Sequence, residues 1–272
     1  GSGMYNLDGI KNIKAVKVET PFGEPSDEFI TGTLGTFDVV FLARHGKGHG
    51  LLPSELNFRA NIFAMKKLGV EMIISVSAVG SLKKEFRPRD FVIPDQFVDR
   101  TTKRNATFFG EGIVAHIGFA DPVCPVLSQI LYDAGRSLKI RMHKGGVYIN
   151  MEGPQFSTRA ESNLYRSWGM DIIGMTNLAE AKLSREAEIC YTTLAMVTDY
   201  DCWYEQEETV TVEMIIQNLL SNVDSARKLL KIAIEKIPEK RVCLCKDALK
   251  NAIITNPDYI SAKVKDTLKP II

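Results

Sequence analysis

Short apolar runs alternate with helical patterns along most of the chain. Runs of mainly apolar residues predict buried strands, and apolar positions that recur every three or four residues predict helices. The predicted strands are 38–42, 72–76, 91–94, 146–149, 171–175 and 194–197, and the predicted helices are 60–67, 123–138 and a run from Thr211 to Pro238. This alternation predicts an α/β fold with a central mixed, largely parallel sheet flanked by helices.

No repeat or low-complexity linker interrupts this pattern. We therefore expect one domain over residues 1–272, with a C-terminal helical tail that starts at about residue 239. Residues 78–81, which follow the second predicted strand, are expected to form a loop.

Polar side chains follow several of the predicted strands. In open α/β sheets, ligands bind just beyond the carboxyl ends of the strands, so these positions are candidates for one site. The number of strand ends that carry polar groups exceeds what core packing requires and predicts an enzyme. The candidate positions at these strand ends, with the two apolar neighbours Ala78 and Met175 included, are Arg44, His45, Ser77, Ala78, Glu152, Met175, Thr176, Asp199 and Asp201.

Two of these groups indicate specific chemistry. Arg44 ends a strand before the glycine-rich, basic loop 46–50, which suits phosphate, although the chain has no P-loop motif. Asp199 and Asp201 can act as a general acid pair or lie on a surface loop; with no histidine nearby, metal binding is not expected. Glu152, which ends an apolar run, is expected to have a partner. Gly1-Ser2-Gly3 is either an anion-binding turn or the remnant of an expression tag before Met4.

Composition narrows the class of protein. The 272 residues include 34 Lys+Arg and 33 Asp+Glu, a net charge of +1, which argues against binding to nucleic acid or anionic membranes. No apolar run approaches the ~20 residues of a membrane span, and no signal peptide is visible. The odd number of cysteines, 5, without CxxC pairs, predicts a cytoplasmic protein with mostly reduced thiols and no zinc site. Cys243 and Cys245 are either incidental thiols or a disulfide pair.

Five separated motifs stand out together: Phe41 to His49 (FLARHGKGH), Ser75 to Leu82 (SVSAVGSL), Met151 to Glu161 (MEGPQFSTRAE), Gly174 to Leu178 (GMTNL) and Thr198 to Trp203 (TDYDCW). They resemble motifs of the S-methyl-5'-thioadenosine phosphorylases, a family of the trimeric purine nucleoside phosphorylases. They occur in the family's order, and the resemblance spans the chain up to about Ile237. The resemblance implies a nucleoside phosphorylase-like domain and a pentosyltransferase reaction of purine and methionine salvage, in which phosphate attacks C1' of the sugar and the purine leaves.

The resemblance also implies roles for individual residues. Phosphate would be the co-substrate, with no cofactor and no metal, and the enzyme would be a homotrimer or a pair of trimers. Asp199 and Asp201 would face N7 and the 6-amino group of adenine, and Asp199 is the first candidate for the general acid. The phosphate pocket would comprise Ser2, Arg44, His45, Ser77, Ala78 and Thr176; the nucleoside would contact Phe156, Met175 and Tyr200; Ser157 and Val212 would set specificity; His116 would reach a neighbouring subunit's site.

Two other functions are compatible with the sequence. One is a purine nucleoside phosphorylase of broader or 6-oxopurine specificity, although Asp rather than Asn at both base positions favours adenine. The other is a non-catalytic nucleoside-binding protein of the same fold. Phosphate-dependent release of purine would separate an enzyme from a binding protein.

Overall fold

The computed structural model describes residues 7–204 and 212–272, whose strands form two sheets. The smaller sheet is antiparallel and contains β1 (Lys11–Val16), β2 (Phe29–Leu34) and β3 (Phe37–Phe41). The larger sheet contains, in spatial order, β6 (Gln96–Arg100), β8 (Val147–Met151), β9 (Ile172–Gly174), β4 (Met72–Ser81), β10 (Cys190–Asp199), β5 (Phe91–Ile93) and β7 (Met142–Lys144).

The larger sheet is mixed and mostly parallel, as the sequence predicted. Strand β10 pairs in parallel with β4, and the pairs β6–β8, β8–β9 and β5–β7 are also parallel. Only β5 against β10 and β9 against β4 are antiparallel. Every residue of β10 is buried, because helices cover both faces of the sheet at this central strand.

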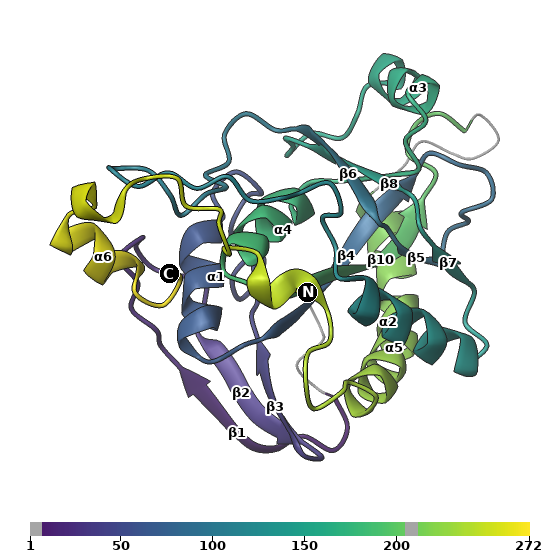
Figure 1. Cartoon of the computed structure of the whole chain (residues 1–272). Helices are drawn as coiled ribbons and strands as arrows, with labels where there is room; N and C mark the ends of the chain where they lie inside the picture. The colour runs from purple at the N-terminus through teal and green to yellow at the C-terminus, as the bar shows by residue number, and fades with distance from the viewer. Residues whose placement is uncertain (1–6, 205–211) are drawn as a thin grey trace.

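Four helices provide this cover (Figure 1). Helices α1 (Phe58–Lys67) and α4 (Asn177–Glu186) share a core with Tyr191 of β10. Helices α2 (Pro125–Ser137) and α5 (Val212–Glu235) share a second core with Leu194 and Met196. Nearer the carboxyl ends of β4 and β10, Val79 and Val197 belong to a third buried cluster.

Several elements differ from the sequence prediction. Strand β4 continues to Ser81, so the loop expected at 78–81 is wrong: Gly80 and Ser81 pair with β9. Strands β1, β2, β6 and β7 were not predicted, and β1 is almost wholly exposed, so it lacks alternation. Helix α4 was missed because it is buried nearly all round, which removes the apolar and polar faces of an ordinary helix.

Helix α3 (Arg159–Ser167) was also missed, although its start carries a clear signal. Thr158 and Glu161 form a reciprocal capping box, in which each side chain accepts from the other residue's backbone N–H. The expected N-cap of α5, Thr211, lies outside the described residues.

The tail after Pro238 contains only short helices. They are η1 (Leu244–Asp247), η2 (Pro257–Tyr259) and α6 (Ala262–Leu268). The tail packs on the body of the domain, since Ile253 bridges to Ala115 and Leu268 enters the core of α1 and α4. In the described ranges, no helix is long and apolar enough to cross a membrane.

Candidate active site

A cavity of about 410 Å³ opens at the carboxyl ends of β4, β9 and β10. Its walls come from segments far apart in the sequence, as expected for a site at the ends of sheet strands. The predicted site residues that line it are Arg44, His45, Ser77, Ala78, Phe156, Met175, Thr176, Asp199 and Asp201.

Arg44 forms a buried ion pair with Glu180 of α4. Its Nη1 donates to both carboxylate oxygens of Glu180, at 3.0 and 2.8 Å, and to Ser75 Oγ at 2.7 Å, while Nη2 donates to the Val76 carbonyl at 3.1 Å. Burial lowers the pKa of Arg44, but the charge of Glu180, its hydrogen bond to Arg44 and the nearby Tyr191 and Tyr148 together raise it above its usual value. The guanidinium is therefore charged and fixed, with its Nε buried and without a partner.

His45 is neutral near pH 7. Burial and, to a lesser extent, the charge of Arg44 lower its pKa to about 4, partly opposed by the hydrogen bond to the Leu51 backbone. Nδ1 lies 2.9 Å from the Leu51 carbonyl oxygen. Because a carbonyl only accepts, Nδ1 carries the proton and Nε2 is an acceptor. The ring also stacks on His49, 4.3 Å between centroids.

The N-terminus of α4 adds donors near Arg44. Thr176 is the N-cap of this helix and is almost fully buried, and its side chain makes no capping bond to the helix. Ser77 of β4 is also buried. A helix N-terminus with hydroxyl groups beside it favours an anion. This end of the cavity can therefore hold a phosphate-sized anion.

Two carboxyl groups lie in the same cavity. Asp199 is 5% exposed; its Oδ2 accepts from Thr198 Oγ1 at 2.7 Å, and its Oδ1 accepts from the Asp201 backbone N–H at 2.8 Å. Asp201 has a positive φ of 53°, and its Oδ2 is buried without a hydrogen-bond partner. Burial raises the pKa of Asp201. The hydroxyls of Ser162 and Ser157 beside this carboxyl group partly oppose the rise.

Met175 and Phe156 supply apolar wall between these polar groups. The backbone of Met175 is held by Arg104, whose Nη2 donates to its carbonyl at 3.3 Å. Arg104 also pairs with Glu152, which confirms that this carboxylate has a partner. Hydrogen bonds from Thr102 and Ser54, with the charge of Arg104, outweigh burial and lower the pKa of Glu152 to about 2.

Some predicted residues lie away from this cavity. Tyr200 donates to the Lys84 carbonyl at 3.2 Å and packs against Trp203. Ser157 is buried beside Met151, and Val212 is 57% exposed at the start of α5. His116 is exposed, and its backbone N–H donates to Ala252 of the tail at 2.9 Å. Ser2 lies outside the described residues.

Sequence reasoning missed the residues that hold the site in place. Glu180, Ser75 and Arg104 do not stand at strand ends in the pattern, and only the fold brings them to Arg44 and Met175. A buried Arg requires a carboxylate partner, but the sequence does not say which one. Leu219 of α5 also lines the cavity and was not predicted.

Known proteins match this chain over its whole length. The profile of the phosphorylase superfamily matches residues 2–235. The S-methyl-5'-thioadenosine phosphorylase of Koribacter versatilis is 59% identical over 272 residues, which is 100% of this chain and 93% of that protein. A crystal structure of a methylthioadenosine phosphorylase from an antarctic soil metagenomic library is 49% identical, with a TM-score of 0.95 over 100% of this chain and 96% of the other.

A more distant structure carries a ligand. The methylthioadenosine phosphorylase of Schistosoma mansoni, solved in complex with adenine, is 36% identical with a TM-score of 0.88, over 95% of this chain and 97% of that one. Identity at this level over full length, with one shared fold, shows common descent. The chain belongs to the phosphorylase superfamily and, within it, to the family of S-methyl-5'-thioadenosine phosphorylases.

Proposed function

We propose that this protein catalyses the phosphorolysis of S-methyl-5'-thioadenosine, a reaction that yields adenine and 5-methylthioribose 1-phosphate. The observation that carries the proposal is one cavity with an anion-binding end at Arg44 and Thr176 and a carboxyl end at Asp199 and Asp201. Membership of the S-methyl-5'-thioadenosine phosphorylase family supports the same reaction. The products of this reaction fit the purine and methionine salvage that the motifs imply.

At the anion end, inorganic phosphate is the nucleophile. One of its oxygens attacks C1' of the sugar, and the C1'–N9 bond breaks with its electron pair going to the purine. The hydroxyls of Ser77 and Thr176 and the N-terminus of α4 donate to phosphate. Nε2 of neutral His45 accepts a hydrogen bond from a protonated phosphate oxygen, and the fixed charge of Arg44 stabilises the anion.

At the other end, the purine needs a proton on N7 to leave easily. We assign this proton to Asp199, and we assign the carboxyl group of Asp201 as the acceptor of the 6-amino group, because Asp201 lines the same cavity. A 6-oxo group offers a second acceptor at the same place, so adenine is preferred over a 6-oxopurine.

Apolar side chains suit the rest of the nucleoside. Met175 would lie against the sugar and Phe156 against the base. Ile215 and Leu219 of α5 line the cavity, and they suit a methylthio group at the 5' position. Because Val212 is exposed and does not line the cavity, we assign the 5' pocket to these two residues instead. Ser157 and Tyr200 act indirectly, by packing behind the site.

We further propose that the active unit is a homotrimer or a pair of trimers in the cytoplasm, without cofactor. His116 is exposed and lies on a segment that is anchored by the tail, which leaves its side chain available to a neighbouring subunit. Sedimentation of the active enzyme would test this assembly, and a fully active monomer would contradict it.

The test of function is incubation of the full chain with S-methyl-5'-thioadenosine, with and without phosphate, while free adenine is measured. Adenine release that depends on phosphate, with one equivalent of sugar 1-phosphate, is the expected result. Release without phosphate would indicate a hydrolase. Binding without release in either condition would indicate a non-catalytic nucleoside-binding protein.

A further inference from the structure

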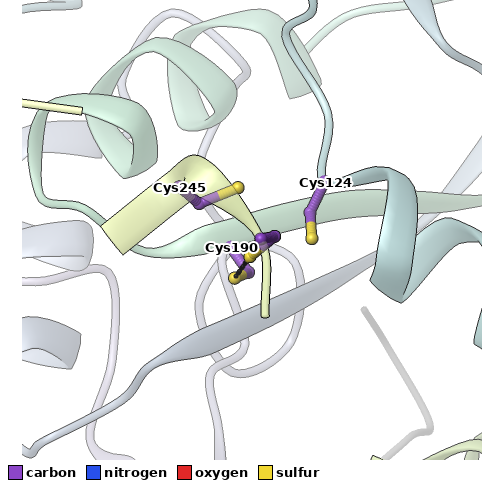
Figure 2. A group of neighbouring side chains, drawn as sticks. Cys124, Cys190 and Cys245 are labelled. Carbon is purple, nitrogen blue, oxygen red and sulfur yellow. Dashed lines mark hydrogen bonds between the residues drawn. The ribbon is translucent and has the colours of Figure 1, made fainter. Parts of the chain in front are cut away.

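Four of the five cysteines converge at one buried point outside the active-site cavity. Cys124 stands at the N-terminus of α2, Cys190 begins β10, and Cys243 and Cys245 flank the start of η1. Figure 2 shows the labelled sulfurs of Cys124, Cys190 and Cys245 directed toward one another from these three elements. The spacing along the chain gives no sign of this group.

The geometry suits a tetrahedral metal ion. All four sulfurs lie within 4.8 Å of one another, and the sulfurs of Cys190 and Cys243 are 3.2 Å apart. Four thiolates around one Zn²⁺ at ~2.3 Å would be about 3.8 Å apart, which falls inside this range. A small cavity of about 10 Å³ lies against Cys124, Cys190 and Cys243.

The four sulfur donors indicate which metal the site would bind. Four sulfur ligands without oxygen or nitrogen select zinc or iron over hard cations such as Mg²⁺. The sulfurs are closed off from solvent, since each of the four residues is at most 8% exposed. Closed four-coordinate sites are typical of structural zinc, whereas catalytic zinc keeps an open position.

We propose that Cys124, Cys190, Cys243 and Cys245 bind one structural Zn²⁺ ion. The four thiols release their protons to solvent on binding, and the resulting centre carries two negative charges. Arg241 also lines the small cavity beside the sulfurs. It is held by the Glu188 carbonyl at 2.6 Å and by the Glu71 carboxylate at 3.4 Å.

The ion would fasten the C-terminal tail to the domain. Two ligands belong to the start of the tail, and the other two belong to α2 and to the central strand β10. Beyond η1, the tail pairs with the segment that carries His116: Val114 N–H donates to Thr255 Oγ1 at 2.8 Å, and His116 N–H donates to the Ala252 carbonyl at 2.9 Å. Loss of the metal would therefore loosen this segment too.

The first test is the metal content of the full chain, expressed with zinc in the medium and purified without chelators. Elemental analysis is expected to give one zinc per chain, and titration after denaturation in a chelator is expected to give all 5 cysteines as free thiols. A result of five free thiols and no bound metal would overturn the proposal, because the cluster would then be only apolar packing. A result of fewer than five free thiols and no bound metal would also overturn it, and would indicate disulfides instead. Stoichiometric iron would overturn the assignment to zinc.

Variants locate the site. Cys245→Ser is expected to lose the zinc, and Cys202→Ser is the matched control, since Cys202 lies outside the cluster and donates to the Ser157 carbonyl. If Cys245→Ser retains its zinc, or if Cys202→Ser loses it, zinc does not bind at the proposed cysteine cluster. If Cys245→Ser does not fold, cobalt exchanged into the wild-type protein gives the answer: thiolate-to-cobalt charge-transfer bands support four sulfur ligands, and their absence contradicts them.

A readout of the tail tests the structural role. Hydrogen exchange of the Val114 and His116 amides is measured in the zinc-loaded protein and after removal of zinc by a chelator. Faster exchange of both amides after removal is expected. Unchanged exchange, with the zinc gone, would refute the claim that the metal holds the tail.

Discussion

The ion pair between Arg44 and Glu180 gives the sharpest prediction about the phosphate end of the cavity. Sequence reasoning predicts that Arg44→Ala weakens phosphate binding and leaves the fold intact. The structure changes the second half of this prediction. Arg44 and Glu180 side chains are 10% and 11% exposed, so removal of the guanidinium leaves a buried carboxylate without its charge partner.

The magnitude follows from that burial. Removing one member of a buried ion pair costs about 3–5 kcal/mol of the free energy of unfolding. A domain of this size loses roughly 2–4 °C of melting temperature for each kcal/mol, so Arg44→Ala is expected to melt about 6–20 °C lower. The hydrogen bonds from Ser75 and Tyr191 to Glu180 remain and keep the loss toward the lower end.

The assay combines thermal unfolding with phosphate saturation. Arg44→Ala, Glu180→Gln and the double variant Arg44→Met with Glu180→Leu form the set. Each single variant is expected to lose stability, and the double variant is expected to recover most of it, because no buried charge stays unpaired. Both variants that lack Arg44 are expected to need more phosphate for half-saturation, by about ten- to a hundredfold.

Two outcomes would refute this reasoning. If Arg44→Ala melts like the wild type, the ion pair is not a buried, fixed contact. If the double variant recovers its stability and saturates with phosphate normally, Arg44 is structural and does not bind phosphate.

Three further predictions concern Asp199, Asp201 and His45. Asp199→Asn is expected to lower kcat by roughly 10²–10⁴-fold with a much smaller change in KM, which steady-state kinetics would measure. If Asp199→Asn turns over almost normally and Asp201→Asn shows the large loss instead, the two residues exchange roles. Burial raises the pKa of Asp201, so its ionisation destabilises the fold above the ordinary Asp pKa; Asp201→Asn is expected to melt higher than the wild type at pH 7 and equally at pH 3. The pKa of His45 is about 4 in the folded protein, so on acidification the unfolded chain binds a proton at this residue before the folded chain does. The free energy of unfolding is therefore expected to fall between about pH 6.5 and pH 4, and to fall less in His45→Asn. Denaturant titrations in which His45→Asn loses as much stability as the wild type would contradict this.

The sequence predicted the fold class and the residues that converge on the cavity for one physical reason. Strand β10 is buried on both faces, so its apolar run is continuous, and Asp199 marks its carboxyl end. The exposed strand β1 and the mostly buried helix α4 carry neither periodicity, and the pattern did not reveal them.

Contacts between distant segments explain the other differences. Glu180, which fixes Arg44, and the cysteine cluster depend on packing that no spacing along the chain encodes. Tyr200 illustrates the reverse case: it stands between Asp199 and Asp201 in the sequence, but its side chain donates to the Lys84 carbonyl and packs against Trp203.

The most direct test of the proposed reaction compares kcat/KM for S-methyl-5'-thioadenosine, adenosine and inosine at saturating phosphate. A 6-oxo group opposite Asp201 leaves two acceptors facing each other, a mismatch that costs about 1–3 kcal/mol, or roughly ten- to a hundredfold. An apolar 5' pocket rejects an added hydroxyl only weakly, so adenosine is expected to be used, but less well than the methylthio compound. Inosine used as well as S-methyl-5'-thioadenosine, or better, would contradict the account and favour a purine nucleoside phosphorylase of 6-oxopurine specificity.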